Sequence, residues 1–205
     1  MRTKAIIAAA ACLLLGAVPQ TGRAAGVSFP DGQGPSISER TVFYDVSGDS
    51  KDELLADLRS KGVALPDGRR CKGWTKWWVS WKYESREVGY GGMCKLSNVR
   101  VAAEIEYTLP RLVNSAAVPP ALAKTWDKIA GDLKSHLTII GQHGVGAARD
   151  IYKKLVNLPA ALCEFIGENA DGEANVIIED YKKADADYTR KKTSCEKAED
   201  TELIR

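Results

Sequence analysis

Hydrophobic positions along the chain recur with two different periods, first of two residues and later of three to four. Apolar side chains occupy every second position in two segments, 75–83 and 99–107, as in strands with one buried face. A turn rich in glycine separates these segments, which makes them a hairpin, and 41–46 has the composition of a further strand. The pattern therefore predicts three strands.

The helical period appears in three other segments. The first begins at Ser50, where Glu53 completes a capping box, and ends at Gly62. Beyond two consecutive prolines, apolar residues lie three or four positions apart over 122–155, which predicts one long helix. A last helix is expected over 174–192.

The order strand, helix, strand, strand, helix, helix predicts an α+β fold with a small antiparallel sheet, a long helix on it and further helices packed beside that helix. We expect a single domain over 41–195. A flexible lead-in rich in Gly, Pro and Ser precedes it at 25–40, and a charged tail follows it at 196–205.

The first 24 residues have the features of a secretion signal. Arg2 and Lys4 precede 14 apolar residues at 5–18, and small residues suit cleavage after Ala24. A spanning helix needs roughly 20 apolar residues, and no later stretch approaches that length. The sequence therefore predicts a periplasmic or secreted protein with no membrane span in the mature chain.

Charge argues against nucleic acid as a partner. Residues 1–24 carry three of the 29 basic residues and no acid, which leaves 26 basic residues against 27 acidic ones. A nucleic-acid-binding domain normally has a basic surface, and a nearly neutral chain does not predict one.

The mature chain keeps four cysteines, and an even number in an oxidising compartment predicts disulfides. Four cysteines allow three pairings, and chain order favours Cys71–Cys94 with Cys163–Cys195, because each pair would close a local unit. No C-x-x-C is present, so neither a dithiol redox site nor a thiolate zinc site is expected.

The two histidines, His136 and His143, are the candidates for metal chemistry. They lie two turns apart on one helix face, whereas a single ion bound by two helical histidines favours a spacing of four residues. Asp132 does have chelating spacing to His136. The glycine-rich stretch 141–146 follows no strand, so we interpret it as closely packed helix glycines.

Several elements at 107–188 resemble the bacterial family of unknown function 922, whose members are predicted secreted zinc-dependent proteases. The resemblance rests on the Y-x-x-P-R-like element at 107–111, on Trp126, on L-x-x-H at 133–136, on the alanines at 147–148 and on Cys163. The strand and helix at 41–62 and the hairpin extend it to most of 41–195. This resemblance implies a zincin-like helix in which His136 is the first zinc ligand.

The chain departs from the family pattern at the residues that carry the chemistry. In the resemblance, Leu137 replaces the general-base glutamate and Ile140 replaces the second histidine, and the element at 187–195 lacks its histidine. A zinc hydrolase needs about three protein ligands and a base for the bound water. We therefore expect a degenerate motif with no catalytic residue and no required cofactor.

The tryptophan cluster offers a different kind of site. Trp77 and Trp81 share a strand face with apolar residues and are expected in the core. Trp78 points the opposite way, beside lysines, and Trp74 lies where the strand begins. Exposed tryptophan beside lysine suits a sugar ring or a peptide, so Trp74 and Trp78 are candidate binding residues.

The sequence favours an exported, non-catalytic binding or envelope-associated protein with an unknown protein or peptide partner in the cell envelope. One alternative is a metallopeptidase-like hydrolase whose remodelled zinc site uses His136 and His143. Its further ligand would be Asp132, Asp150 or a carboxylate of the last helix, Glu179 or Asp180. Another is a glycan or peptide binder that uses its exposed tryptophans.

Overall fold

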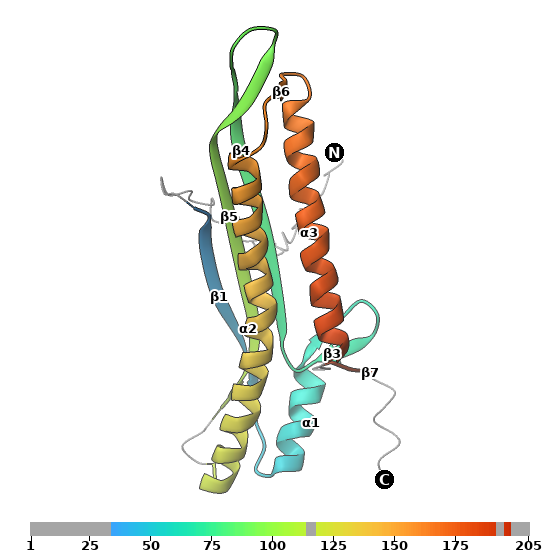
Figure 1. The fold of residues 1–205 in the computed structure, drawn as a ribbon. Coiled ribbons are helices and arrows are strands. Elements are labelled where there is room, and N and C mark those ends of the chain that lie inside the picture. Colours follow the sequence, from blue (N-terminus) through green and yellow to red (C-terminus); the bar gives the residue numbers. More distant parts are fainter. Residues whose placement is uncertain (1–33, 114–117, 192–194, 198–205) are drawn as a thin grey trace, which may run out of the picture.

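The computed structural model describes residues 34–113, 118–191 and 195–197 (Figure 1). The predicted α+β class and the order of the long elements are confirmed. The expected signal peptide lies outside the described residues. The elements are β1 (Ser36–Val46), α1 (Lys51–Lys61), β2 (Val63–Ala64), β3 (Arg69–Cys71), β4 (Trp74–Glu87), β5 (Met93–Leu112), α2 (Pro120–Val156), β6 (Ala161–Leu162), α3 (Ile166–Lys191) and β7 (Cys195–Lys197).

The main sheet has the strand order β1-β5-β4, and β6 pairs with the start of β5. β4 and β5 are antiparallel, as predicted for a hairpin, but β1 runs parallel to β5. The expectation of a purely antiparallel sheet is therefore wrong for β1. A tight turn forces its two strands to be antiparallel, whereas the long connection through α1 permits either direction.

Three boundaries differ from the expected ones. β1 begins at Ser36, so the last five residues of the expected lead-in form strand, and α3 begins at Ile166 rather than at 174. Backbone pairing with β5 orders the start of β1 although its side chains there are mainly polar. The start of the expected tail belongs to β7, and 198–205 lies outside the described residues.

The main core lies between the sheet and α2, which crosses one face of it (Figure 1). Trp77 and Trp81 pack against this core from β4, as predicted, and α3 lies beside α2. The β4 side chains that point to the opposite face are exposed. They are Lys76, Trp78, Ser80 and Lys82.

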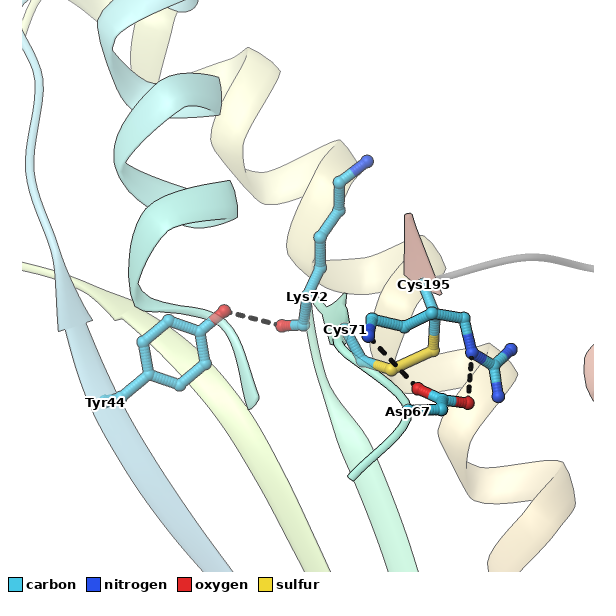
Figure 2. Close-up of a disulfide and its surroundings, with 6 residues drawn as sticks. Tyr44, Asp67, Cys71, Lys72 and Cys195 are labelled. Atoms are coloured by element: carbon cyan, nitrogen blue, oxygen red, sulfur yellow. Dashed lines mark hydrogen bonds and ion pairs between the residues drawn. A yellow bond between two sulfur atoms is a disulfide. The ribbon is translucent and has the colours of Figure 1, made fainter. Parts of the chain in front are cut away.

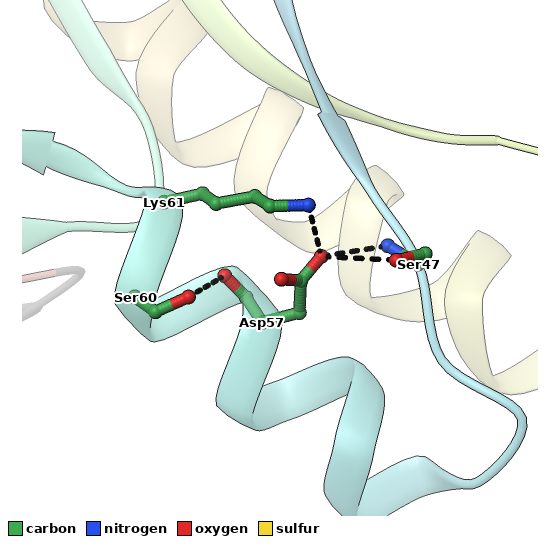
Figure 3. Close-up of polar contacts among 4 residues, drawn as sticks. All are labelled: Ser47, Asp57, Ser60 and Lys61. Carbon is green, nitrogen blue, oxygen red and sulfur yellow. Dashed lines mark hydrogen bonds and ion pairs between the residues drawn. The ribbon is translucent and has the colours of Figure 1, made fainter.

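A second apolar cluster joins α1 to the end of β1. Leu54 and Leu58 of α1 are buried in it, and Ser50 caps the helix by accepting a hydrogen bond from the Glu53 amide at 3.2 Å, as predicted. Asp57 then ties the helix to the chain after β1, because its carboxylate accepts from the Ser47 amide and from Lys61, each at 2.8 Å (Figure 3). Burial raises the pKa of Asp57, but these hydrogen bonds outweigh it and lower the pKa overall.

Both disulfides are present, but the expected pairing is wrong. Cys71 pairs with Cys195, which joins β3 to β7 (Figure 2), and Cys94 pairs with Cys163, which joins β5 to the segment before α3. The 26 residues of α3 separate Cys163 from Cys195 by about 39 Å, and β4 separates Cys71 from Cys94 by a similar length. Bonded cysteines need alpha carbons within about 7 Å. Each observed bond instead fastens one end of α3.

We expect non-reducing proteolysis and mass spectrometry of the oxidised protein to find peptides linking Cys71 to Cys195 and Cys94 to Cys163. Replacing Cys94 and Cys163 together by serine should lower the free energy of unfolding by about 2–5 kcal/mol, because the crosslink restricts the unfolded chain. A peptide linking Cys71 to Cys94 would contradict this arrangement.

Candidate functional site

Both histidines lie on the side of α2 that faces α3, where two tyrosines of α3 meet them. The ring of His136 stacks on that of Tyr188, with centroids 4.9 Å apart and planes 18° apart. The same Tyr188 ring meets His143 edge-on at 6.4 Å. An aromatic ring of α3 therefore packs against both imidazoles.

His143 has a carboxylate partner that orients its ring. Its Nδ1 lies 2.5 Å from Oδ1 of Asp185, and the other carboxylate oxygen of Asp185 accepts a hydrogen bond of 2.6 Å from the indole N–H of Trp77. Asp185 thus connects α3 to α2 and to β4 at one point. Such a carboxylate is also the usual partner of a zinc-binding or catalytic histidine.

A second tyrosine adds another contact between the two helices. The hydroxyl of Tyr181 donates a 2.8 Å hydrogen bond to Asp150 of α2, and its ring lies 6.1 Å from His143. Burial, followed by the neighbouring Asp150 carboxylate, raises the pKa of Tyr181 to about 12. The hydroxyl therefore stays protonated at physiological pH and remains a hydrogen-bond donor.

Glycines of α2 allow its close approach to the sheet and to α3. A Cβ on Gly144 would lie 2.7 Å from the Cβ of Trp77, and one on Gly146 would lie 2.7 Å from the Tyr181 hydroxyl. A Cβ on Gly141 would overlap the hydroxyl of Tyr107. The interpretation of 141–146 as closely packed helix glycines is confirmed.

The candidate metal ligands do not form one cluster. Asp132 is exposed on α2, one turn from His136, while His143 contacts Asp185. Within the described ranges, no group of three His, Cys, Asp or Glu side chains is close enough to hold a metal ion. The described geometry thus provides a carboxylate-oriented His143 but no zinc-binding set among the described residues.

The residues that replace the base and the second ligand in the resemblance belong to the core. Leu137 is 1% exposed, and its backbone carbonyl accepts a 3.0 Å hydrogen bond from the buried hydroxyl of Thr75. Ile140 is also buried, in the same cluster. These two positions therefore stabilise the packing of α2 on the sheet.

Trp78 lies on the face of the sheet opposite α2, as predicted, and is 48% exposed. Trp74 is only half-buried on the same face, four residues away along β4. Lys76 lies between them on this face, and the register places Glu104 beside Trp78 and Glu106 beside Lys76. The result is an aromatic surface bordered by both signs of charge.

A family model for bacterial proteins of unknown function, DUF922, matches residues 41–196. The chain belongs to this family. No curated protein and no solved structure matches the chain significantly. Membership in DUF922 therefore identifies the domain without assigning an activity to it.

The contacts of this DUF922 domain include several residues that the sequence analysis did not select. Asp185 carries the central contact, and Tyr181 and Tyr188 of the same helix meet the ring of His143. A signal was present, because Asp185 lies four residues after one tyrosine and three before the other. A carboxylate on the apolar face of a helix indicates a specific partner, and here that partner is His143.

An open groove of about 660 Å³ adjoins this interface at the C-terminal end of α2. Its apolar lining comes from Leu158, Pro159 and Ile177. Lys154 and Glu173, which also line it, form an ion pair of 3.0 Å. The opposite charges of Lys154 and Glu173 cancel, so this pair favours neither an anionic nor a cationic ligand in the groove.

We expect Gly144→Ala to destabilise the DUF922 domain by about 1–3 kcal/mol, because the new methyl group overlaps Trp77. Gly131→Ala is the matched control on the same helix. A Cβ there meets nothing within 4 Å, so the variant should gain up to about 1 kcal/mol from helix propensity. Urea denaturation of both oxidised proteins measures the difference, and equal stabilities would contradict the close packing.

Proposed function

We propose that this DUF922 domain is an exported, periplasmic binding protein that lacks peptidase activity. The observation that carries the proposal is the burial of Leu137 at 1% exposure, at the position that the family resemblance assigns to the general base. A base must reach the water that it deprotonates, and an alkyl side chain within a packed core cannot do so.

The contacts of the histidines support the same proposal. A remodelled zinc site would need His136 and His143 to face one ion, but the Tyr188 ring packs against both of them. Asp185 orients His143, as it would in a metal site, yet the same carboxylate also binds Trp77. The network holds α3 on α2 and β4, and this structural role accounts for its residues without a metal ion.

Export is proposed from two features. The chain begins with a basic and apolar segment typical of a secretion signal, and two disulfides persist best in an oxidising compartment. In the part of the chain that the structure describes, no helix has the length and apolar character needed to cross a bilayer. A partner in the cell envelope follows from this location.

The outer face of the sheet is the candidate binding surface. Trp78 exposes about half of its area there, between lysines and glutamates of the neighbouring positions. A rigid indole on a strand loses little conformational freedom on binding, and its ring can stack on a sugar or a peptide side chain. This observation favours glycans or extended peptides as ligands.

Elemental analysis of the protein purified after export tests the absence of a zinc site. We expect substoichiometric zinc and no change in thermal midpoint on adding a chelator, because removing a bound ion would otherwise destabilise the fold. His136→Ala and His143→Ala are measured alongside Gln142→Ala, a control at an exposed position on the same helix. About one zinc per chain, lost in both histidine variants and kept in the control, would support the hydrolase alternative instead.

Tryptophan fluorescence tests the proposed surface. Titration with soluble glycans and with peptides of mixed charge should quench the wild-type signal, and Trp78→Ala should weaken binding at least about tenfold, as expected for an aromatic anchor. Tyr90→Ala, at the fully exposed tip of the β4–β5 hairpin, is the control and should bind normally. Undiminished binding by Trp78→Ala, measured by calorimetry, would exclude this surface.

A further inference from the structure

β1 is an edge strand with exposed apolar side chains on both of its faces. Among the residues that the structure describes, it pairs with β5 on one side and with no strand on the other. Ile37 and Phe43 are 37% and 52% exposed and lie on the face of the sheet against which α2 packs. Val42 is 46% exposed and lies on the opposite, outer face. An edge of this kind can template pairing with another strand.

The other edge of the sheet carries lysines and a bulge that oppose such pairing, whereas β1 is charged at Glu39, Arg40 and Asp45 but has neither of those devices. β4 carries Lys76 and Lys82, and its register with β5 shifts between Lys82 and Glu84. Lysines and bulges are the usual devices that prevent edge-to-edge association. β1 contains neither lysine nor proline, and its register with β5 continues without a bulge from Ser36 to Val46.

We infer that β1 pairs antiparallel with β1 of a second copy of this chain, centred on Arg40, so that one sheet continues through both copies. A two-fold axis perpendicular to the sheet keeps each residue on its own face, so opposed residues must differ by an even number. Centring on Arg40 places Ile37 opposite Phe43 of the second copy, and by symmetry Phe43 opposite Ile37. The exposed apolar residues of this face then cover each other twice.

Charge distinguishes this register from its neighbours. Centring on Thr41 would place the charged Glu39 opposite Phe43 and Asp45 opposite Ile37, so the apolar residues would not cover each other. Centring on Val42 would oppose Glu39 to Asp45, and like charges directly opposite each other destabilise a strand pair. Centring on Arg40 does oppose two arginines, but each forms an ion pair with Glu106 of its own chain, so that the opposed groups are neutral pairs.

Phe43 is also held in place for such a contact. The guanidinium of Arg111 lies 5.9 Å from its ring centroid, and Arg111 in turn forms a 2.7 Å ion pair with Asp45. A ring already supported on one side loses less freedom when a partner covers it. This self-complementarity makes a second copy, rather than an unrelated peptide, the occupant of the edge.

Sedimentation equilibrium of the exported protein tests the inference. The wild type should form a dimer, and Phe43→Lys should raise its dissociation constant at least about tenfold while far-UV circular dichroism shows that the fold is kept. Val176→Lys, at a 58% exposed position on α3, is the matched control and should still dimerise. A dimer that Phe43→Lys does not weaken overturns the inference.

Cysteine crosslinking tests the register while leaving Arg40 in place. Ser38 and Val42 are opposed when the pair is centred on Arg40, so a mixture of Ser38→Cys and Val42→Cys should form a crosslinked heterodimer under mild oxidation. Crosslinking of Val42→Cys with itself would place the centre at Val42 and overturn the proposed register. A wild type that is monomeric at every concentration overturns the dimer. Amide exchange of that monomer then shows whether the β1 edge is open to solvent or covered by another part of the same chain, and neither result rescues the inference.

Discussion

The close approach of α2 to the sheet is the constraint on which the rest of the structure depends. Gly141 and Gly144 bring the helix backbone against Tyr107 and Trp77, at distances that leave no room for a Cβ. A helix this close to the sheet buries a continuous apolar face, in which Leu137 is enclosed. The same contact determines the rotation of α2 about its axis and therefore the side on which its histidines emerge.

The position of α3 follows from that rotation. Its inner face bears carboxylates where purely apolar residues would be expected, and each has a partner in a neighbouring element. Asp185 contacts His143 and Trp77, while Asp171 accepts from the indole of Trp81 at 2.8 Å. Each of these contacts joins α3 to a particular residue of α2 or β4, so together they specify how α3 is placed.

The disulfides complete the attachment of α3, one near each of its ends. Neither bond could be assigned from chain order. The predicted helix at 174–192 leaves residues 164–173 outside it, and ten extended residues could bring Cys163 back to Cys195. Only the observed start of α3 at Ile166, directly after Cys163, excludes that pairing.

By itself, the sequence determined the long elements and, in β4 and α2, which side chains they bury. The alternation in β4 separated Trp77 from Trp78, and the spacing in α2 identified its buried face, because both depend on local backbone geometry. Only the tertiary structure decided the parallel direction of β1, the cysteine pairing and the contact between Asp185 and His143. These features join residues far apart in the chain, and their geometry depends on how whole elements pack rather than on the residues beside them.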